Sequence, residues 1–283
     1  MRARTPSRGS LAYAHARIRA WKSRLLTRAG AAPLFAATDA AAIQRAIAAL
    51  ELDDPLRRLL RVYQTAIDGY RNGAPLFRAM LQRHEIENVK LLWRVVANGH
   101  RDRVARLWID LGAFASFPLP EAPTLNELVA QVAATPYAEI ARSVARVHGT
   151  DLAAAELAFD RWASRRLLEE ARRLPKQESI ARRLIELVVR EREAELVLRG
   201  AKWYGLASVA PGNITDITAL RRERLRFCHR AFIGRPFLLG SAVAVILLAE
   251  EEVRAVRALV ERMGDERLDA AMIRSMAASQ VGA

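Results

Sequence analysis

The chain has 283 residues, of which 52% are hydrophobic, and this apolar content excludes an intrinsically disordered protein. A single cysteine, Cys228, excludes an intramolecular disulfide framework and favours a reducing compartment such as the cytoplasm. The formal net charge of +14 favours an acidic partner, nucleic acid or an anionic membrane surface, without choosing between them. Arg used for Lys on solvated helix faces explains the same charge without any partner.

Helix patterns recur from one end of the chain to the other, whereas the alternating pattern of strands is nearly absent, so the sequence predicts an all-α fold. The first helix is predicted from an apolar stripe at steps of three and four, formed by Leu11, Ala14, Ile18, Trp21 and Leu25. A second helix is predicted to begin at Pro55, with Asp54 as its N-cap, because a missing N–H costs nothing in the first turn.

The stretch 84–99 is predicted to be a helix that ends at Gly99 and that carries polar residues beside its apolar stripe. The stripe is formed by Ile86, Val89, Trp93 and Val96. A polar edge beside it is formed by Glu87, Lys90 and Arg94. Asn88 lies on another flank and has two open interpretations: a partly exposed residue, or a buried amide bonded to the backbone of a neighbouring helix.

A proline-rich loop is predicted at 112–123, followed by a helix with a capping box formed by Thr124 and Glu127. The next helix is predicted to begin at 135–136 and to stop near Gly149, and a longer one follows Asp151. Further helices are predicted at about 178–205, 221–232, 237–263 and 269–276. The longest apolar run, 236–249, is about 14 residues long, whereas a bilayer span needs about 20, so a buried helix is expected there.

Local sequence patterns recur along the chain at irregular spacing. The pattern WKSRLL at 21–26 returns as WASRRLL at 162–168, and Glu252 and Arg257 align with Glu85 and Lys90 in another pair of related segments. We therefore expect three related helical units with diverged loops. The expected division is unit one at 1–111, a loop at 112–123, unit two at 124–206 and unit three at 207–283.

Motifs for enzymatic chemistry are not convincing in this sequence. Neither glycine-rich nucleotide-binding pattern is present, and the adjacent Cys228 and His229 point about 100° apart on a helix, so they do not easily share a metal or a proton. The other histidines are interpreted as surface or capping residues: His15, His84, His100 and His148. The acidic run Glu250, Glu251 and Glu252 is interpreted as a solvated or partner-facing edge. The sequence therefore predicts no catalytic, cofactor-binding or metal-binding residue.

Taken in order, several motifs resemble the C/d subunit family of V-type and A-type rotary ATPases. They are YAHARIRAWKSRLL at 13–26, HEIENVKLLWR at 84–94, TPYAEI at 135–140, AELAFDRWASRRL at 155–167, LRGAKWYGL at 198–206 and AEEEVRAVRALVERMG at 249–264. The residues that match the family's motifs are Tyr13, Arg17, Lys22, Arg24, Glu85, Asn88, Lys90, Glu156, Asp160, Arg161, Arg199, Lys202, Glu252 and Arg257. The chain departs from the family at Arg190 and Glu193, where Asp-x-x-Asn tends to repeat, and at Ala255, where another Asn would fall.

The resemblance implies three similar helical units around a pseudo-threefold axis, shaped like a funnel. It implies a non-catalytic subunit on the cytoplasmic face of the membrane, between the central shaft subunits (D and F type) and the membrane rotor ring (c or K type) of the same ATPase. No cofactor and no small-molecule substrate are expected, and contact with the membrane surface is open. The alternative is a basic helical nucleic-acid-binding or adaptor protein, although no helix-turn-helix, zinc or base-stacking signature supports it.

Overall fold

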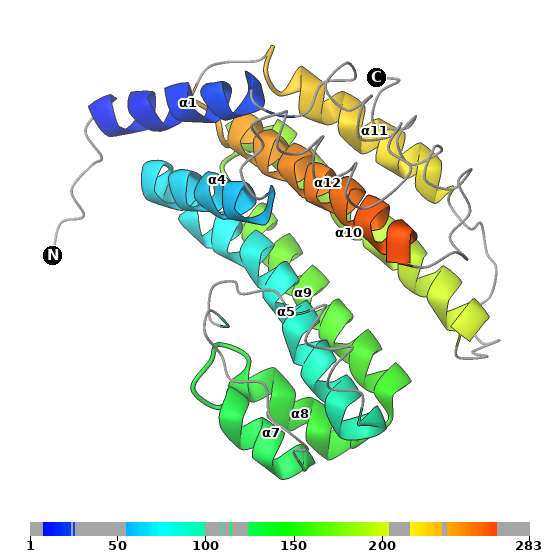
Figure 1. Cartoon of the computed structure of the whole chain (residues 1–283). Coiled ribbons are helices and arrows are strands. Elements are labelled where there is room, and N and C mark those ends of the chain that lie inside the picture. The colour runs from blue at the N-terminus through cyan, green and yellow to red at the C-terminus, as the bar shows by residue number, and fades with distance from the viewer. Residues whose placement is uncertain are drawn as a thin grey trace, which may run out of the picture. The chain divides into compact units, whose positions relative to one another are not determined.

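The computed structural model describes residues 8–23, 25, 55–99, 108, 114, 124–203, 216–233 and 237–264 (Figure 1). All regular structure in these ranges is helical, which confirms the all-α prediction. The chain separates into two compact units, which we call unit 1 and unit 2 independently of the three helical units predicted from the sequence. Unit 1 comprises Met1–Ala74, Leu174–Glu191 and Ile214–Ala283, and unit 2 comprises Pro75–Arg173 and Arg192–Asn213. Three units around a pseudo-threefold axis remain a prediction.

Among the residues that the structure describes, unit 1 contains four α-helices and the first part of a fifth. They are α1 (Arg8–Ser23), α4 (Pro55–Gly69), α10 (Ser179–Trp203) as far as residue 191, α11 (Ile217–Arg230) and α12 (Leu239–Gly264). Two short 3₁₀ turns, η1 (Arg71–Gly73) and η3 (Lys176–Glu178), also belong to this unit. Helix α12 packs against α4, α11 and α1, and α1 packs against α4.

The predicted apolar stripe of α1 lies in the core of unit 1, where Ala14, Ile18 and Trp21 are buried. Gly69, at the end of α4, makes this packing possible, because a Cβ added there would lie 2.0 Å from Cβ of Ala14. The first half of α12 is buried on all sides from Ala242 to Leu247, as expected for an internal helix that is apolar all round. None of the helices that the structure describes combines the length and hydrophobicity needed to cross a bilayer.

Unit 2 contains most of α5 (Ala74–Asn98), together with α7 (Leu125–Val132), α8 (Ala138–His148), α9 (Leu152–Arg172) and the rest of α10. Its core joins the α5 stripe to α7, α8 and α9, and includes Ile86, Val89 and Trp93. The indole of Trp93 meets the ring of Phe159 edge to face, with 5.0 Å between centroids, and its N–H donates to the carbonyl of Gly149. The core stripe predicted for 84–99 is therefore confirmed.

Helix ends follow the capping signals in the sequence at most positions. Gly99 has a φ of 69° and Gly149 a φ of 56°, so both occupy the positive-φ region in which glycine ends a helix. The capping box of Thr124 and Glu127 and the side-chain cap of Asp151 are both formed. One start differs: α8 begins at Ala138 and not at 135–136, because the hydroxyl of Thr135 donates to the Val132 carbonyl and accepts from the Tyr137 N–H in a turn.

The last two described helices also differ slightly from the predicted bounds. Helix α11 begins at Ile217, four residues earlier than expected, because the carboxylate of Asp216 accepts the N–H of Thr218. Helix α12 begins at Leu239, after Phe237 with a φ of 69°. The predicted loop at 112–123, apart from Phe114, and the predicted helix at 269–276 lie outside the described residues.

Candidate functional site

Charged and polar side chains inside the two helical units are the features that hydrophobic packing does not explain. A buried charge is stable only when it is paired and hydrogen-bonded, so each one has to be specified by partners on other helices. Among the described residues, each unit contains a cluster of this kind that joins three helices.

The Asp160 cluster of unit 2 consists of Glu87, Lys90, Asp160 and Arg192. The carboxylate of Asp160, on α9, accepts from Nζ of Lys90 at 3.0 Å and from the guanidinium of Arg192 at 2.8 Å. Glu87, on α5, accepts from the same two cations at 2.8 Å and 2.7 Å. Burial alone would lower the pKa of Arg192, but Glu87 and Asp160 outweigh it and raise that pKa. The cluster therefore joins α5, α9 and α10 through charged hydrogen bonds.

Lys90 is the residue for which the sequence interpretation is wrong. It was expected on a polar edge, but it is completely buried, with 0% of its surface exposed. The reason is that Asp160 and Glu87 both face its ammonium group, so the charge is satisfied inside the protein instead of by water.

Two further polar contacts in unit 2 extend from α5. Nε of Arg94 donates to Glu156 of α9 at 2.5 Å. The buried phenol of Tyr137, the residue before α8, donates to the carboxylate of Glu85. Burial first, and then the charge of Glu85, raise the pKa of Tyr137, so the phenol keeps its proton and remains a donor.

The Arg224 cluster of unit 1 consists of Glu191, Arg221, Arg224, Glu251 and Arg254. Arg224, on α11, is 3% exposed; it donates to Glu191 of α10 at 2.8 Å and to Glu251 of α12 at 2.5 Å. Arg221 adds a bond to Glu191 at 3.1 Å, and Arg254 adds one to Glu251 at 2.6 Å. The cluster therefore joins α10, α11 and α12.

The pKa values in the Arg224 cluster follow from this pairing. Burial alone would raise the pKa of Glu251, but Arg254 and Arg224 outweigh it and lower the value to about 2. Burial likewise opposes ionisation of Glu191, and Arg224 overcomes it and lowers that pKa. Both carboxylates are therefore charged at neutral pH although they are buried.

The acidic run Glu250, Glu251 and Glu252 corrects a second sequence interpretation, because all three residues are buried and do not form a solvated edge. Successive side chains radiate around a helix, so each of the three meets a different partner. Glu250 accepts from the phenol of Tyr63, Glu251 from Arg224, and Glu252 from Arg58. The two outer partners lie on α4, so the acidic run bonds α12 to two neighbouring helices.

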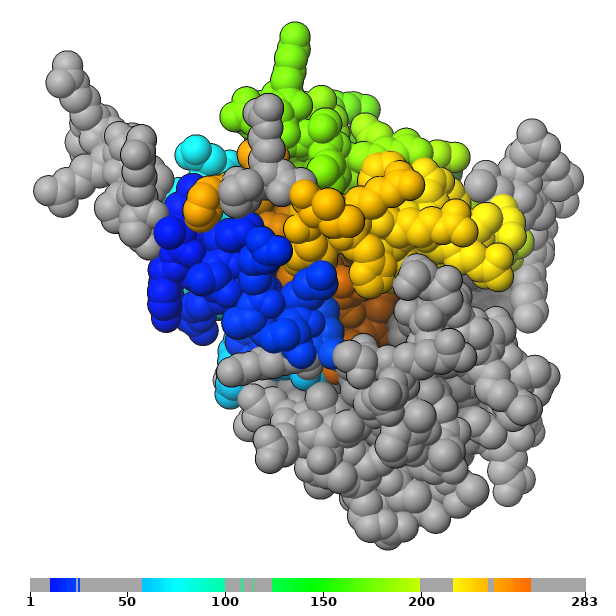
Figure 2. All heavy atoms as spheres, turned by 90° about the horizontal axis from the view of Figure 1, so that it is seen from above, coloured from blue at the N-terminus to red at the C-terminus, as the bar shows by residue number. Residues whose placement is uncertain are grey.

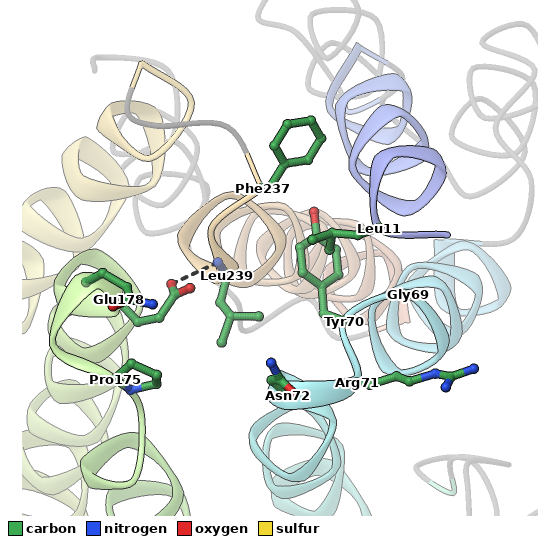
Figure 3. A pocket seen from close by; sticks show the side chains of 10 residues that line it. Leu11, Gly69, Tyr70, Arg71, Asn72, Pro175, Glu178, Phe237 and Leu239 are labelled. Carbon is green, nitrogen blue, oxygen red and sulfur yellow. Dashed lines mark hydrogen bonds between the residues drawn. The ribbon is translucent and has the colours of Figure 1, made fainter. Parts of the chain in front are cut away.

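A small pocket in unit 1 is lined by Tyr70, Glu178, Phe237 and Leu239, among other residues (Figure 3). Glu178 accepts the backbone N–H of Leu239 at 2.8 Å, and its pKa is raised because burial outweighs the two backbone N–H bonds. The pocket has a volume of about 110 Å³. Pockets that bind small molecules measure about 300–1,000 Å³, so this one accommodates no nucleotide.

His15 contacts two residues that line this pocket, Tyr70 and Phe237, and it corrects the sequence interpretation of the histidines. It is 8% exposed, its Nδ1 lies 3.2 Å from the Tyr70 hydroxyl, and its ring centroid lies 5.0 Å from that of Phe237. Burial, together with the nearby Arg19, lowers the pKa of His15, and burial raises that of Tyr70 to about 12. His15 is therefore a neutral, packed residue and not a surface residue.

Cys228 is fully buried, and burial raises the pKa of its thiol to about 12, whereas the neighbouring His229 is exposed. The two side chains thus have different surroundings, as their positions on the helix predicted. Among the described residues, no group of three or more His, Cys, Asp or Glu side chains could hold a metal ion.

The residues that matched the family motifs fall into three groups. Six are buried: Glu85, Asn88, Lys90, Glu156, Asp160 and Glu252. Four are exposed: Tyr13, Arg17, Lys22 and Arg161. The side chains of Arg24, Arg199, Lys202 and Arg257 lie outside the described residues.

Asn88 is 0% exposed, which confirms the buried interpretation, and its bond to the backbone of a neighbouring helix remains a prediction. Glu191, Arg192 and Arg224 were not predicted from the sequence to form clusters, although a signal was present. Each continues the apolar steps of its helix, as Arg224 does between Leu220 and Cys228.

The comparison with protein families agrees with these motifs. A family model described as "ATP synthase (C/AC39) subunit" matches residues 14–214. The chain belongs to the C/AC39 family. Members of this family are subunits of V-type and A-type ATP synthases. The matched residues include the whole Asp160 cluster and, from the Arg224 cluster, Glu191. A search among curated proteins returned no significant match.

Proposed function

We propose that this C/AC39-family chain is a non-catalytic central-stalk subunit of a rotary ATPase, a socket that couples the central shaft to the membrane rotor ring. The observation that carries the proposal is the family match over residues 14–214. Coupling of this kind serves ATP-linked transport of protons or sodium ions, and catalysis belongs to other subunits of the complex.

The two buried clusters support a mechanical role. Torque passes through a protein only if its helices do not slide past one another under load. A slip of one helical turn, about 5.4 Å, would separate a charge in either cluster from its partners. Breaking a buried ion pair costs about 3–5 kcal/mol, so each cluster opposes sliding of the three helices that it joins.

The proposed partners are the shaft subunits of the D and F type and the rotor-ring subunits of the c or K type, on the cytoplasmic face of the membrane. The absence of glycine-rich nucleotide-binding motifs in the sequence and the small size of the pocket in unit 1 support a role without a nucleotide of its own. Torque transmission requires no small-molecule substrate.

The proposal is tested by purifying the tagged full chain from detergent-solubilised membranes. Ring, shaft and catalytic subunits should be recovered together with it. Membranes that lack the chain should keep ATP hydrolysis by the catalytic subunits but lose ATP-driven ion pumping, and the wild-type chain should restore pumping. Recovery of the chain without the ring and shaft would contradict the proposal, as would binding to duplex DNA that persists at physiological salt.

A further inference from the structure

The outer face of α11 carries arginines of a different kind from those on its inner face. The inner pair, Arg221 and Arg224, is held by Glu191 and Glu251. The exposed positions follow one another at helical steps and form what we call the α11 face: Arg222, Arg226, His229, Arg230 and Ile233. Among the described residues, no carboxylate pairs with the three outer arginines. The helix's one acidic residue, Glu223, accepts instead from Arg183 at 2.7 Å.

A second helix adds positive charge beside this face. Helix α1 contains no acidic residue, and Arg17, Arg19 and Lys22 are exposed on it. The ammonium group of Lys22 lies 4.2 Å from the ring centroid of Phe232, next to the end of α11. The pKa of His229 is lowered first by its partial burial and then by the charge of Lys22. In Figure 2, α1 in blue and α11 in yellow both reach the surface of unit 1.

A large apolar side chain is exposed at the end of the same face. Ile233 lies three residues after Arg230, the last arginine of α11, and is 85% exposed. Ordinary protein surfaces intersperse both signs of charge and keep such side chains few. A run of cations that ends in an exposed apolar side chain therefore suits a partner that is both anionic and apolar.

We propose that the α11 face binds an anionic lipid bilayer directly, with its arginines on the phosphate groups and Ile233 in the interfacial layer. Three arginines over about 12 Å of helix match a diffuse layer of phosphates, and apolar side chains enter a bilayer without a preformed groove. This contact goes beyond the function proposed above, in which other subunits hold the chain at the membrane.

The test is flotation of the purified full chain with vesicles of phosphatidylcholine, with or without phosphatidylglycerol, at physiological salt. The wild-type chain should float only with the anionic vesicles. Changing Arg222→Glu, Arg226→Glu and Arg230→Glu together should weaken binding at least about a hundredfold, because loss of each cation near the surface alone contributes about a fivefold change and the new carboxylates are repelled. Ile233→Ser should weaken binding by a smaller factor, and relatively more at high salt, where the apolar contribution dominates.

Two controls separate this proposal from its competitors. Arg146→Glu, Arg165→Glu and Arg172→Glu change the net charge by the same amount at exposed positions of unit 2, and this variant should bind much more tightly than the α11 variant. The variant with Lys at the three α11 arginine positions should bind vesicles like the wild type, since a lipid surface needs only point charges. If the face instead recognised an acidic polypeptide through bidentate arginines, the lysine variant would lose binding.

Four results would overturn the proposal. They are absence of wild-type binding to anionic vesicles, equal binding to both vesicle types, equal loss in the two glutamate variants, and loss of binding in the lysine variant. Because flotation uses the chain alone, none of these results depends on whether the chain joins a rotary ATPase.

Discussion

Unit 1 and unit 2 both contain a three-helix charge cluster, but the order of charge is reversed between them. In the Arg224 cluster a buried cation lies between two carboxylates, and in the Asp160 cluster a buried carboxylate lies between two cations. The difference matters when one member is lost. Without Arg224, two buried carboxylates would lose their shared cation, whereas without Lys90 the Asp160 carboxylate would keep Arg192.

The largest expected effect comes from removing the central cation of the Arg224 cluster. Arg224→Met should lower the free energy of unfolding by about 3–5 kcal/mol, because it leaves uncompensated buried charge. Lys90→Met should cost about half as much, because Arg192 still pairs with both carboxylates of the cluster. Urea unfolding measures the totals, and hydrogen exchange shows which helices open first. Arg226→Met, at an exposed position of α11, should stay within about 0.5 kcal/mol. Equal costs for Arg224→Met and Lys90→Met would contradict the comparison.

The next largest effect should be a loss of stability in acid, caused by protonation of carboxylates in the Arg224 cluster. The pKa of Glu251 is about 2 in the folded state, against an ordinary value of 4.5, so its contribution is complete above pH 4.5 and is lost as the pH falls towards 2. This lowering corresponds to about 3 kcal/mol, and Glu191 shifts in the same direction. Stability measured from pH 5 to pH 2 should fall accordingly, with α11 and α12 loosening in hydrogen exchange.

Glu251→Gln should flatten this acid dependence, because the substituted residue no longer titrates. The exposed Glu139→Gln in unit 2 is the matched control and should leave the pH profile of the wild type in place. If the profile is unchanged by Glu251→Gln, the Arg224 cluster is not what acid breaks.

The two units also differ at a position that holds a buried amide in unit 2, and the expected effect there is smaller. Asn88→Leu in unit 2 should lower the free energy of unfolding by about 1–3 kcal/mol, because Asn88 is completely buried and its partner would be left without a bond. The corresponding position of the related segment in unit 1 is Ala255, which is half-buried, so Ala255→Asn should change stability by about 0.5 kcal/mol or less. Thermal and urea unfolding of the two variants provide the measurement; a neutral Asn88→Leu would show that the amide is dispensable.

Helix caps should show the smallest effects, and equal ones in both units. Asp151 caps α9 in unit 2 and Asp216 caps α11 in unit 1, each through one side-chain bond to a backbone N–H. Asp151→Ala and Asp216→Ala should each cost about 1 kcal/mol in urea unfolding. The conservative changes to Asn should restore most of it. A large difference between the two alanine variants would mean that one of these carboxylates has a second role.

Helical periodicity predicted the fold well because it depends on local spacing. The buried stripes of α1 and α5, the helix ends at Gly99 and Gly149 and the capping box at Thr124 all follow from residues within a few turns of one another. The start of α11 was missed, although the Asp216 cap is an equally local signal.

The polar interior was predicted poorly for a different physical reason. Lys90 and Glu251 were assigned to polar or solvated faces because charged side chains are normally solvated. The partners that hold them inside the protein include residues on other helices: Asp160 is 70 residues from Lys90, and Arg224 is 27 residues from Glu251. No local spacing encodes such pairs. The family resemblance did single out Lys90, Asp160 and Glu252, but without saying that they are buried.

The placement of Arg224 between two carboxylates also constrains how such a sequence can change over generations. Substituting Arg224 alone leaves Glu191 and Glu251 without their shared cation, and substituting either carboxylate alone removes half of the charge that holds the arginine. Passage to an uncharged interior at this position therefore requires changes on three helices, and each intermediate is less stable than either end. The charged trio is a local optimum from which single substitutions lead only downhill in stability.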